Sequence, residues 1–180
     1  MTYRSLCLPV LLALYACCAF GNLKGTDQVN MHIYGNIIDQ GCDVVTSSAM
    51  QNVFIGDFNI SDFQAANAVS ASADLTIGIT GCAAGIQDAR VYFSGESDPL
   101  APTLLKLTDT GGNGNMATGI AVQIIDAQTQ EEIPLNSLTA RSPLKAGDNE
   151  LKYKLRYKST KEGATGGNAT AVLYFDLVYE

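Results

Sequence analysis

The 180-residue sequence contains no tryptophan and a single histidine, His32. It also lacks a Cys-x-x-Cys pair and any cluster of histidines, the patterns by which zinc sites and redox-active thiols are usually found. Asp98, Asp109 and Asp148 stand in separate segments without the spacing of a metal-binding loop. We therefore expect no catalytic residue, no metal and no cofactor, and we interpret His32 as a solvated polar residue rather than a general base.

Basic residues are also few. The chain has 11 Lys and Arg against 18 Asp and Glu, which gives a formal net charge of −7. Because the basic residues are scattered along the sequence, we expect no basic stripe for phosphate groups. The acidity indicates solubility and weak self-repulsion, and it disfavours nucleic-acid binding.

The sequence contains only one long apolar run. Leu6–Ala19 is too short to span a bilayer, follows Arg4 and precedes small residues, which is the pattern of a secretory signal peptide cleaved after Ala19 or Gly21. Leu14–Cys17 is a weak match to the cleavage pattern of bacterial lipoproteins. Removal of the signal leaves about 160 residues, a length that suits one domain without a membrane anchor.

Only two of the five cysteines, Cys42 and Cys82, lie after the expected signal peptide. Two cysteines in an exported chain indicate one disulfide. Such a bond would close a loop of about 40 residues and stabilise the fold by roughly 4 kcal/mol in the chain-entropy treatment. A catalytic thiol or a pair of metal ligands is the alternative, which the shortage of histidine disfavours.

Short runs with a polar-apolar period of two, separated by Gly, Asn, Asp, Ser and Pro, predict an all-β protein. Only Ser61–Ser72 hints at a helical turn. Many short strands together with one disulfide indicate an immunoglobulin-like β-sandwich. The expected strands span Gln28–Ile38, Cys42–Thr46, Asn52–Phe58, Ala73–Thr80, Arg90–Ser94, Thr103–Leu107, Gly119–Asp126, Glu150–Lys158 and Asn168–Tyr179.

The last of these strands runs to the end of the sequence, with no partner segment after it. Its apolar residues fall on one face, and the opposite face is largely apolar too, so the strand is expected to be buried. A strand at a sheet edge leaves N–H and C=O groups that can pair with another chain. The first face consists of Ala171, Leu173, Phe175, Leu177 and Tyr179.

The segment after the signal peptide alternates in the same way, with Val29, Met31, Ile33, Gly35 and Ile37 on one face. A seven-stranded sandwich that stops at its sixth strand leaves a groove where the last strand should lie. We hypothesise that the N-terminal strand of one molecule fills the groove of the next, which is strand addition at a sheet edge. Because this head-to-tail contact does not close on itself, it generates a filament. The alternative is a plain secreted sandwich that its own N-terminal segment completes.

These features resemble the chaperone–usher pilins, most closely the type 1 fimbrial subunits of Gram-negative bacteria, for which strand addition is a known assembly mode. Ile33–Ile38 is similar to the family's donor segment. Gly167 lies fourteenth from the end of the sequence, before an alternating strand with Tyr179 in the penultimate position. Cys42 and Cys82 sit where the family's disulfide does.

The resemblance implies an incomplete immunoglobulin-like β-sandwich that lacks its last strand and is completed by a donor strand from another chain. It divides the sequence into a signal peptide (1–21), a donor-strand extension (22–38) and a pilin domain (39–180). It also implies an acceptor groove, whose strand pairs first with a periplasmic pilus chaperone and later with a neighbour's donor strand. That strand comprises Gly167, Ala171, Leu173, Phe175, Leu177, Tyr179 and Glu180, and basic chaperone residues would hold the Glu180 carboxylate.

The implied function is that of a structural, non-enzymatic subunit, exported through the periplasm to a surface fimbria and contributing to cell adhesion. Its partners would be the chaperone, the outer-membrane usher and neighbouring pilin subunits, and a host glycan would be reached only through the assembled fibre. Glu132–Asn136 is similar to minor fibre components, which favours a minor position. The alternative function is a secreted carbohydrate-binding adhesin domain of immunoglobulin-like fold, which the lack of tryptophan and of a separate lectin domain disfavours.

Overall fold

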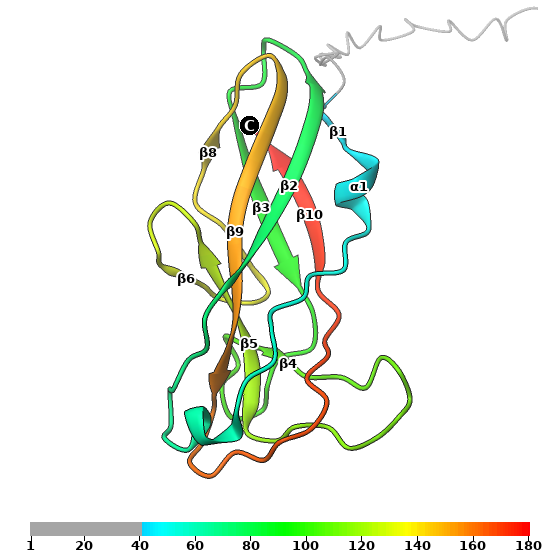
Figure 1. Cartoon of the computed structure of the whole chain (residues 1–180). Coiled ribbons are helices and arrows are strands. Elements are labelled where there is room, and N and C mark those ends of the chain that lie inside the picture. Colours follow the sequence, from blue (N-terminus) through cyan, green and yellow to red (C-terminus); the bar gives the residue numbers. More distant parts are fainter. Residues whose placement is uncertain (1–40) are drawn as a thin grey trace, which may run out of the picture. The chain divides into compact units, whose positions relative to one another are not determined.

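Two antiparallel β-sheets form the part of the chain that the computed structural model describes, residues 41–180 (Figure 1). The larger sheet contains β1 (Asp43–Val44), β2 (Ala73–Cys82), β4 (Leu105–Lys106), β5 (Ile120–Asp126), β6 (Glu132–Ile133) and β9 (Gly147–Ser159). Its strands follow the order β1-β2-β9-β5-β4, and β6 also pairs with β5.

The second sheet contains β3 (Asp88–Ser94), β7 (Ser137–Leu138), β8 (Ser142–Pro143) and β10 (Tyr174–Tyr179). Its order is β10-β3-β7, and β8 also pairs with β3. A four-residue helix, α1 (Thr46–Ala49), and a 3-10 turn, η1 (Ile60–Phe63), interrupt the chain before β2. Within residues 41–180, the helices are too short to cross a membrane.

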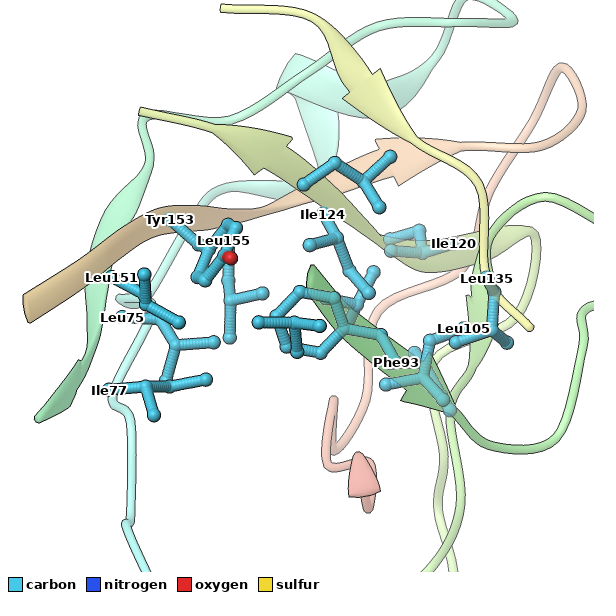
Figure 2. Packing of buried hydrophobic residues seen from close by; sticks show 14 of the residues in the cluster. Leu75, Ile77, Phe93, Leu105, Ile120, Ile124, Leu135, Leu151, Tyr153 and Leu155 are labelled. Carbon is cyan, nitrogen blue, oxygen red and sulfur yellow. The ribbon is translucent and has the colours of Figure 1, made fainter. Parts of the chain in front are cut away.

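The period of two along the long strands places every second side chain between the sheets. In β3, Ala89, Val91 and Phe93 are fully buried, while the residues between them are partly exposed. Phe93 meets Tyr153 of β9 edge to face, with 4.9 Å between the ring centroids (Figure 2). Burial of each large apolar side chain contributes about 1.5–3 kcal/mol, so this contact between the two sheets is the centre of the core.

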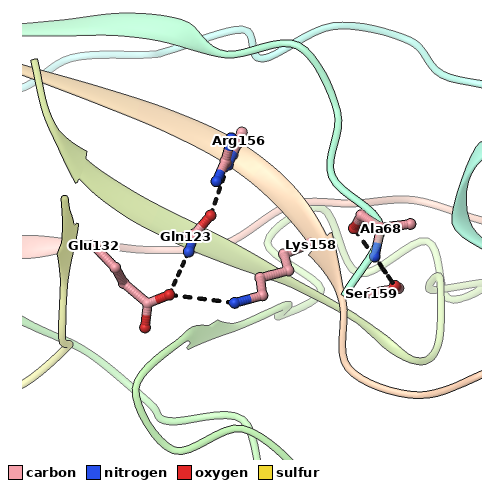
Figure 3. Close-up of polar contacts among 6 residues, drawn as sticks. All are labelled: Ala68, Gln123, Glu132, Arg156, Lys158 and Ser159. Carbon is pink, nitrogen blue, oxygen red and sulfur yellow. Dashed lines mark hydrogen bonds and ion pairs between the residues drawn. The ribbon is translucent and has the colours of Figure 1, made fainter. Parts of the chain in front are cut away.

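Strand β5 is buried on both faces up to Ile125, and its one buried polar side chain is paired. Gln123 is 4% exposed. Its amide donates to the Glu132 carboxylate and accepts from Arg156 Nε at 2.6 Å, while Lys158 Nζ lies 3.3 Å from the same carboxylate (Figure 3). Partial burial alone would raise the pKa of Glu132, but hydrogen bonds from Thr103 and Gln123 and the Lys158 charge outweigh it and lower that pKa. A satisfied polar chain of this kind fixes the strand register without leaving a buried group unpaired.

The buried Ser159 at the end of β9 fastens the segment before β2. Its hydroxyl accepts from the backbone N–H of Ala68 at 2.9 Å (Figure 3) and donates to the carbonyl of Ala65. The side chain thereby adds to the few backbone bonds that residues 67–70 make with β9.

The all-β prediction is confirmed, and β2, β3, β5 and β9 occupy four of the expected segments with shifted ends. Thr103–Leu107 contains only the two-residue β4, and Cys42–Thr46 contains only β1 because α1 begins at Thr46. Within Ser61–Ser72 the helical turn is short and belongs to η1, where Asn59 Oδ1 accepts from the N–H of Ser61 at 3.1 Å. Strands β6, β7 and β8 were not predicted, since two residues are too few to show a period.

The disulfide joins Cys42 and Cys82 across the first strand pair, as predicted. Cys42 precedes β1, Cys82 ends β2, and the ladder between them pairs Asp43 with Thr80. The bond therefore ties the first described residues to the edge of the larger sheet.

Replacing both cysteines, with Cys42→Ser and Cys82→Ser, is expected to reduce the free energy of unfolding by about 4 kcal/mol, because the bond closes a long loop. Urea unfolding of the variant and of the wild type measures the difference. Two free thiols in wild-type protein under non-reducing alkylation, or equal midpoints for the two proteins, would contradict the expectation.

Candidate functional site

β10 turns one apolar row toward the core and the alternate row toward solvent. Val172, Tyr174 and Val178 of the outward row are 42%, 64% and 40% exposed. The expectation that both faces are buried is therefore wrong, because the second face has solvent above it. The inward row is partly buried against the core and consists of Ala169, Ala171, Leu173, Phe175, Leu177 and Tyr179.

One edge of β10 is paired along its whole length. β10 runs antiparallel to β3, from Tyr174 opposite Ser94 to Tyr179 opposite Ala89. Before β10, the expected strand at Asn168–Leu173 is not part of a regular ladder. It bonds instead to other loops, through Ala117 N–H to the Asn168 carbonyl at 2.9 Å and through Thr108 N–H to that of Thr170 at 2.7 Å. Among residues 41–180, no strand pairs with the other edge of β10.

Gly167 permits the close approach that starts this segment. A Cβ atom there would lie 2.4 Å from the Asn115 carbonyl oxygen and 2.6 Å from the Ala117 nitrogen, and its φ is +155°. Real Cβ atoms do not approach backbone this closely, so only glycine fits. The contact lets Asn168 N–H donate to the Asn115 carbonyl at 2.8 Å.

Residues 51–60 contribute a second apolar row, which packs against the same core as the inward row of the C-terminal segment. Val53, Ile55, Phe58 and Ile60 pack against the core, whereas Phe54 is 74% exposed and points away. Asn52–Phe58 was expected to be a strand, but in the described part of the chain it has no partner strand and therefore no ladder. The alternating burial of Val53, Phe54 and Ile55 nevertheless has the period of a strand.

Two tyrosines fasten the ends of the inward row: Tyr179 ties one end to residues 41–42, and Tyr157 joins the other end to Phe58 of the second row. Tyr179 donates its hydroxyl to the Cys42 carbonyl at 3.0 Å, and its ring lies 3.1 Å from where a Cβ of Gly41 would be. At the other end, Tyr157 packs against Phe58, with 6.0 Å between ring centroids, and donates to the Ala169 carbonyl at 2.6 Å. We call the strip of core between residues 53–60 and 169–179 the seam.

Burial keeps both tyrosine hydroxyls protonated. It raises the pKa of Tyr157, with a smaller contribution from Asp57, and it raises the pKa of Tyr179, with a smaller contribution from Asp43. Both groups therefore remain hydrogen-bond donors at neutral pH.

Glu180 lies at the end of β10 and is engaged by the domain itself. Its backbone oxygen accepts from the N–H groups of Gln87 at 3.3 Å and Asp88 at 3.4 Å, and its side chain pairs with Arg141. These contacts fasten the end of β10 to the start of β3.

The seam has the features of a strand-binding site rather than of a catalytic one. A free strand edge offers backbone donors and acceptors, and a half-buried apolar row beneath it offers surface to cover. Across residues 41–180 there is no group of three or more His, Cys, Asp or Glu side chains placed to hold a metal. The arrangement is suited to taking up an extended segment of chain.

The sequence predicted the side of the seam formed by residues 169–179, but not the side formed by residues 53–60. It singled out the alternating residues of β10 and Gly167, but it gave no role to Val53, Ile55 and Phe58, although it recognised their period. The closing contact of Tyr157 with Ala169 has no local sequence signal. The expected donor residues Val29, Met31, Ile33, Gly35 and Ile37 lie outside the described residues.

Comparison with known proteins places this architecture among fimbrial proteins. The pattern of the family described as Fimbrial protein matches residues 31–180. The chain is 76% identical over 158 residues to the fimbrial-like protein YcbU of Escherichia coli (strain K12), with 88% of each chain covered. It is 31% identical over 152 residues to the fimbrial subunit type 1 of Salmonella typhimurium, with 83% of this chain and 82% of that protein covered.

Solved structures show the same fold. The P pilus rod subunit PapA superimposes with a TM-score of 0.65 at 25% identity, covering 78% of this chain and 100% of that one. A chaperone–usher pilus structure, studied for rod uncoiling, matches with a TM-score of 0.64 at 24% identity, covering 87% of this chain and 98% of that one. The second likeness bears on the fold alone.

The Gly167→Ala substitution is expected to destabilise the chain by about 2 kcal/mol or more, because the added Cβ meets three backbone atoms that cannot move aside cheaply. The matched control is Gly85→Ala, where a Cβ would have nothing within 4 Å. Urea unfolding of both variants measures the difference. Equal stability of the two would show that residues 115–117 yield to the new side chain.

Proposed function

The chain belongs to the Fimbrial protein family, and we propose that it is a structural subunit that polymerises by donor-strand exchange and contributes to cell adhesion. It has the incomplete immunoglobulin-like β-sandwich of chaperone–usher pilins, a fold completed by a donor strand from another chain. Its family is structural and not enzymatic. Surface fimbriae of Gram-negative bacteria are built from such subunits.

The observation that carries the proposal is the seam. One edge of β10 has no partner strand among residues 41–180, and the row of Leu173, Phe175 and Leu177 beneath it is only partly buried. The opposite wall has the period of a strand without a ladder. A single inserted strand would pair with this open edge and cover the apolar row at the same time.

We assign the inserted strand to the donor extension of a neighbouring subunit, residues 22–38. Burial of Val29, Met31, Ile33 and Ile37 in the seam would contribute about 6–12 kcal/mol at 1.5–3 kcal/mol each, an upper bound before ordering costs. Gly35 would add no apolar surface, and its use is to let the donor backbone come close to a crowded part of the seam.

The remaining assignments follow the same assembly route. Residues 1–21 direct export and residues 39–180 form the pilin domain. In the periplasm a chaperone strand occupies the seam first, with Glu180 held by basic chaperone residues, and the outer-membrane usher then passes the subunit to its neighbour. We place the subunit among the minor components because Glu132–Asn136 resembles them, although Ile133 and Leu135 of this segment also serve the core.

Deleting Asn22–Ile38 is expected to leave a chain that folds with the chaperone but is absent from fibres, because the disulfide-bonded domain does not need this segment. Mass spectrometry of sheared fimbriae checks both parts of the proposal. Wild-type chain should be present at few copies relative to the shaft subunit, and the deletion variant should be missing. Incorporation of the truncated chain would refute the donor role, and an abundance equal to that of the shaft subunit would refute the minor position.

Adding a copy of Asp27–Ile38 after Glu180 through a short flexible linker is expected to fill the seam within one molecule and raise the melting temperature. In the added copy, Gly35→Leu should weaken this gain through a clash. The matched control, His32→Ser, should be nearly silent because that side chain is expected to face solvent. Thermal melts of the unfused chain, the fusion and its Gly35→Leu and His32→Ser variants measure these differences. An unfused chain as stable as the fusion, or equal tolerance of both substitutions, would mean that the sandwich needs no added strand.

A further inference from the structure

A shallow, open polar hollow lies where β9 begins, between the turn after β5 and the loop after β8. Its volume is about 510 Å³. None of its lining residues belongs to the seam. They are Gln128, Lys145, Asp148, Asn149, Glu150 and Lys152.

The wall of the hollow is held in shape by Asn149. Its Oδ1 accepts from Lys145 N–H at 2.9 Å, and its Nδ2 donates to the carbonyls of Lys145 at 2.8 Å and Gly147 at 3.2 Å. These bonds fix the backbone of the loop that carries Lys145.

A smaller recess of about 60 Å³ continues inward beside the hollow and shares Gln128, Glu150 and Lys152 with it. Tyr153 and Ser142 also line this recess. Tyr153 is 2% exposed, and its hydroxyl makes no direct hydrogen bond within residues 41–180, although the hydroxyls of Thr139 and Ser142 lie close enough to lower its pKa. Leaving a buried hydroxyl unpaired is costly, and most such groups in folded proteins are satisfied.

The Tyr153 hydroxyl remains protonated under physiological conditions. Burial raises its pKa to about 12, with a smaller contribution from the Asp126 carboxylate and against the opposing effect of the Thr139 and Ser142 hydroxyls. The group therefore offers one donor and an acceptor at the end of the recess.

The charges around the hollow balance. Lys145 and Lys152 contribute two positive charges, and Asp148 and Glu150 contribute two negative ones, so the lining sums to zero. Lys152 Nζ already pairs with Glu150 at 3.2 Å, and Asp148 accepts a hydrogen bond from Thr80. Such a surface offers alternating donors and acceptors and gives no net attraction to an ion of either sign.

We propose that the hollow binds a neutral saccharide unit, with one hydroxyl or hydroxymethyl group inserted into the recess against Tyr153 and Ser142. Each sugar hydroxyl both donates and accepts, which matches the mixed lining. A recess of about 60 Å³ has room for one or two groups of the size of water, which takes about 30 Å³ each. With no exposed aromatic ring to stack on, the single-site Kd is expected to be weak, about 1 mM.

Saturation-transfer NMR on the purified exported chain tests the proposal with D-galactose, D-mannose and N-acetyl-D-glucosamine as probes and D-glucuronate as the charged comparator. At least one neutral sugar should receive saturation more strongly than D-glucuronate. Tyr153→Phe should weaken that binding by about fivefold, the effect of one hydrogen bond. The same variant should melt at the wild-type temperature or above, because the lost hydroxyl makes no direct hydrogen bond within residues 41–180.

Two further variants separate binding from structure. Gln128→Ala removes an amide at the mouth of both cavities and should also weaken binding, whereas Tyr174→Phe removes an exposed hydroxyl on β10 and should leave it unchanged. No saturation of any neutral sugar, stronger saturation of D-glucuronate, or equal binding by Tyr153→Phe would overturn the proposal. A lower melting temperature of Tyr153→Phe would also overturn it, since the hydroxyl would then serve the fold. Fibre assembly is not involved in any of these measurements.

Discussion

The open edge of β10 is the constraint on which the rest of this structure depends. Its other edge is paired with β3, but on the open side the strand's N–H and C=O groups face no strand within residues 41–180. Water satisfies exposed backbone groups, yet it leaves the apolar row of Leu173, Phe175 and Leu177 only partly covered. An added strand would pair with the backbone groups of this edge and cover the apolar row at the same time.

The shape of the seam is set by contacts that do not involve the incoming strand. Gly167 brings the segment before β10 against residues 115–117, and Tyr179 and Tyr157 close the two ends through hydroxyl bonds to Cys42 and Ala169. The disulfide at Cys42 then ties the Tyr179 end to β2. A site whose sides are fixed in advance loses less conformational entropy when it is filled, so these contacts would favour the strand addition proposed above.

The period of two made the long strands and the 169–179 side of the seam predictable, because the alternation of buried and exposed side chains is visible in the local sequence. The alternation of β10 was predicted on that basis, and the Cys42–Cys82 disulfide was predicted from the two cysteines that follow the expected signal peptide. The predictions that were wrong or missing concern features that depend on partners distant in the sequence. Asn52–Phe58 has the right period but no ladder, the outward row of β10 has no cover, and the two-residue strands β6, β7 and β8 exist only because longer strands lie beside them. Tyr157 and Tyr153 matter through contacts that no local pattern encodes.

The seam and the hollow differ in chemistry. The seam is apolar beside an open strand edge, which suits a partner that dissociates slowly. The hollow is polar with balanced charge, which suits a weakly bound ligand that exchanges rapidly. Because the two share no residue, a strand in the seam would not itself occupy the hollow. Linked copies of a weak site raise the overall avidity by factors of about 10²–10⁴ when several engage together. Under the two proposals above, the number of copies per fibre would therefore determine whether the hollow acts as one weak contact or as an array.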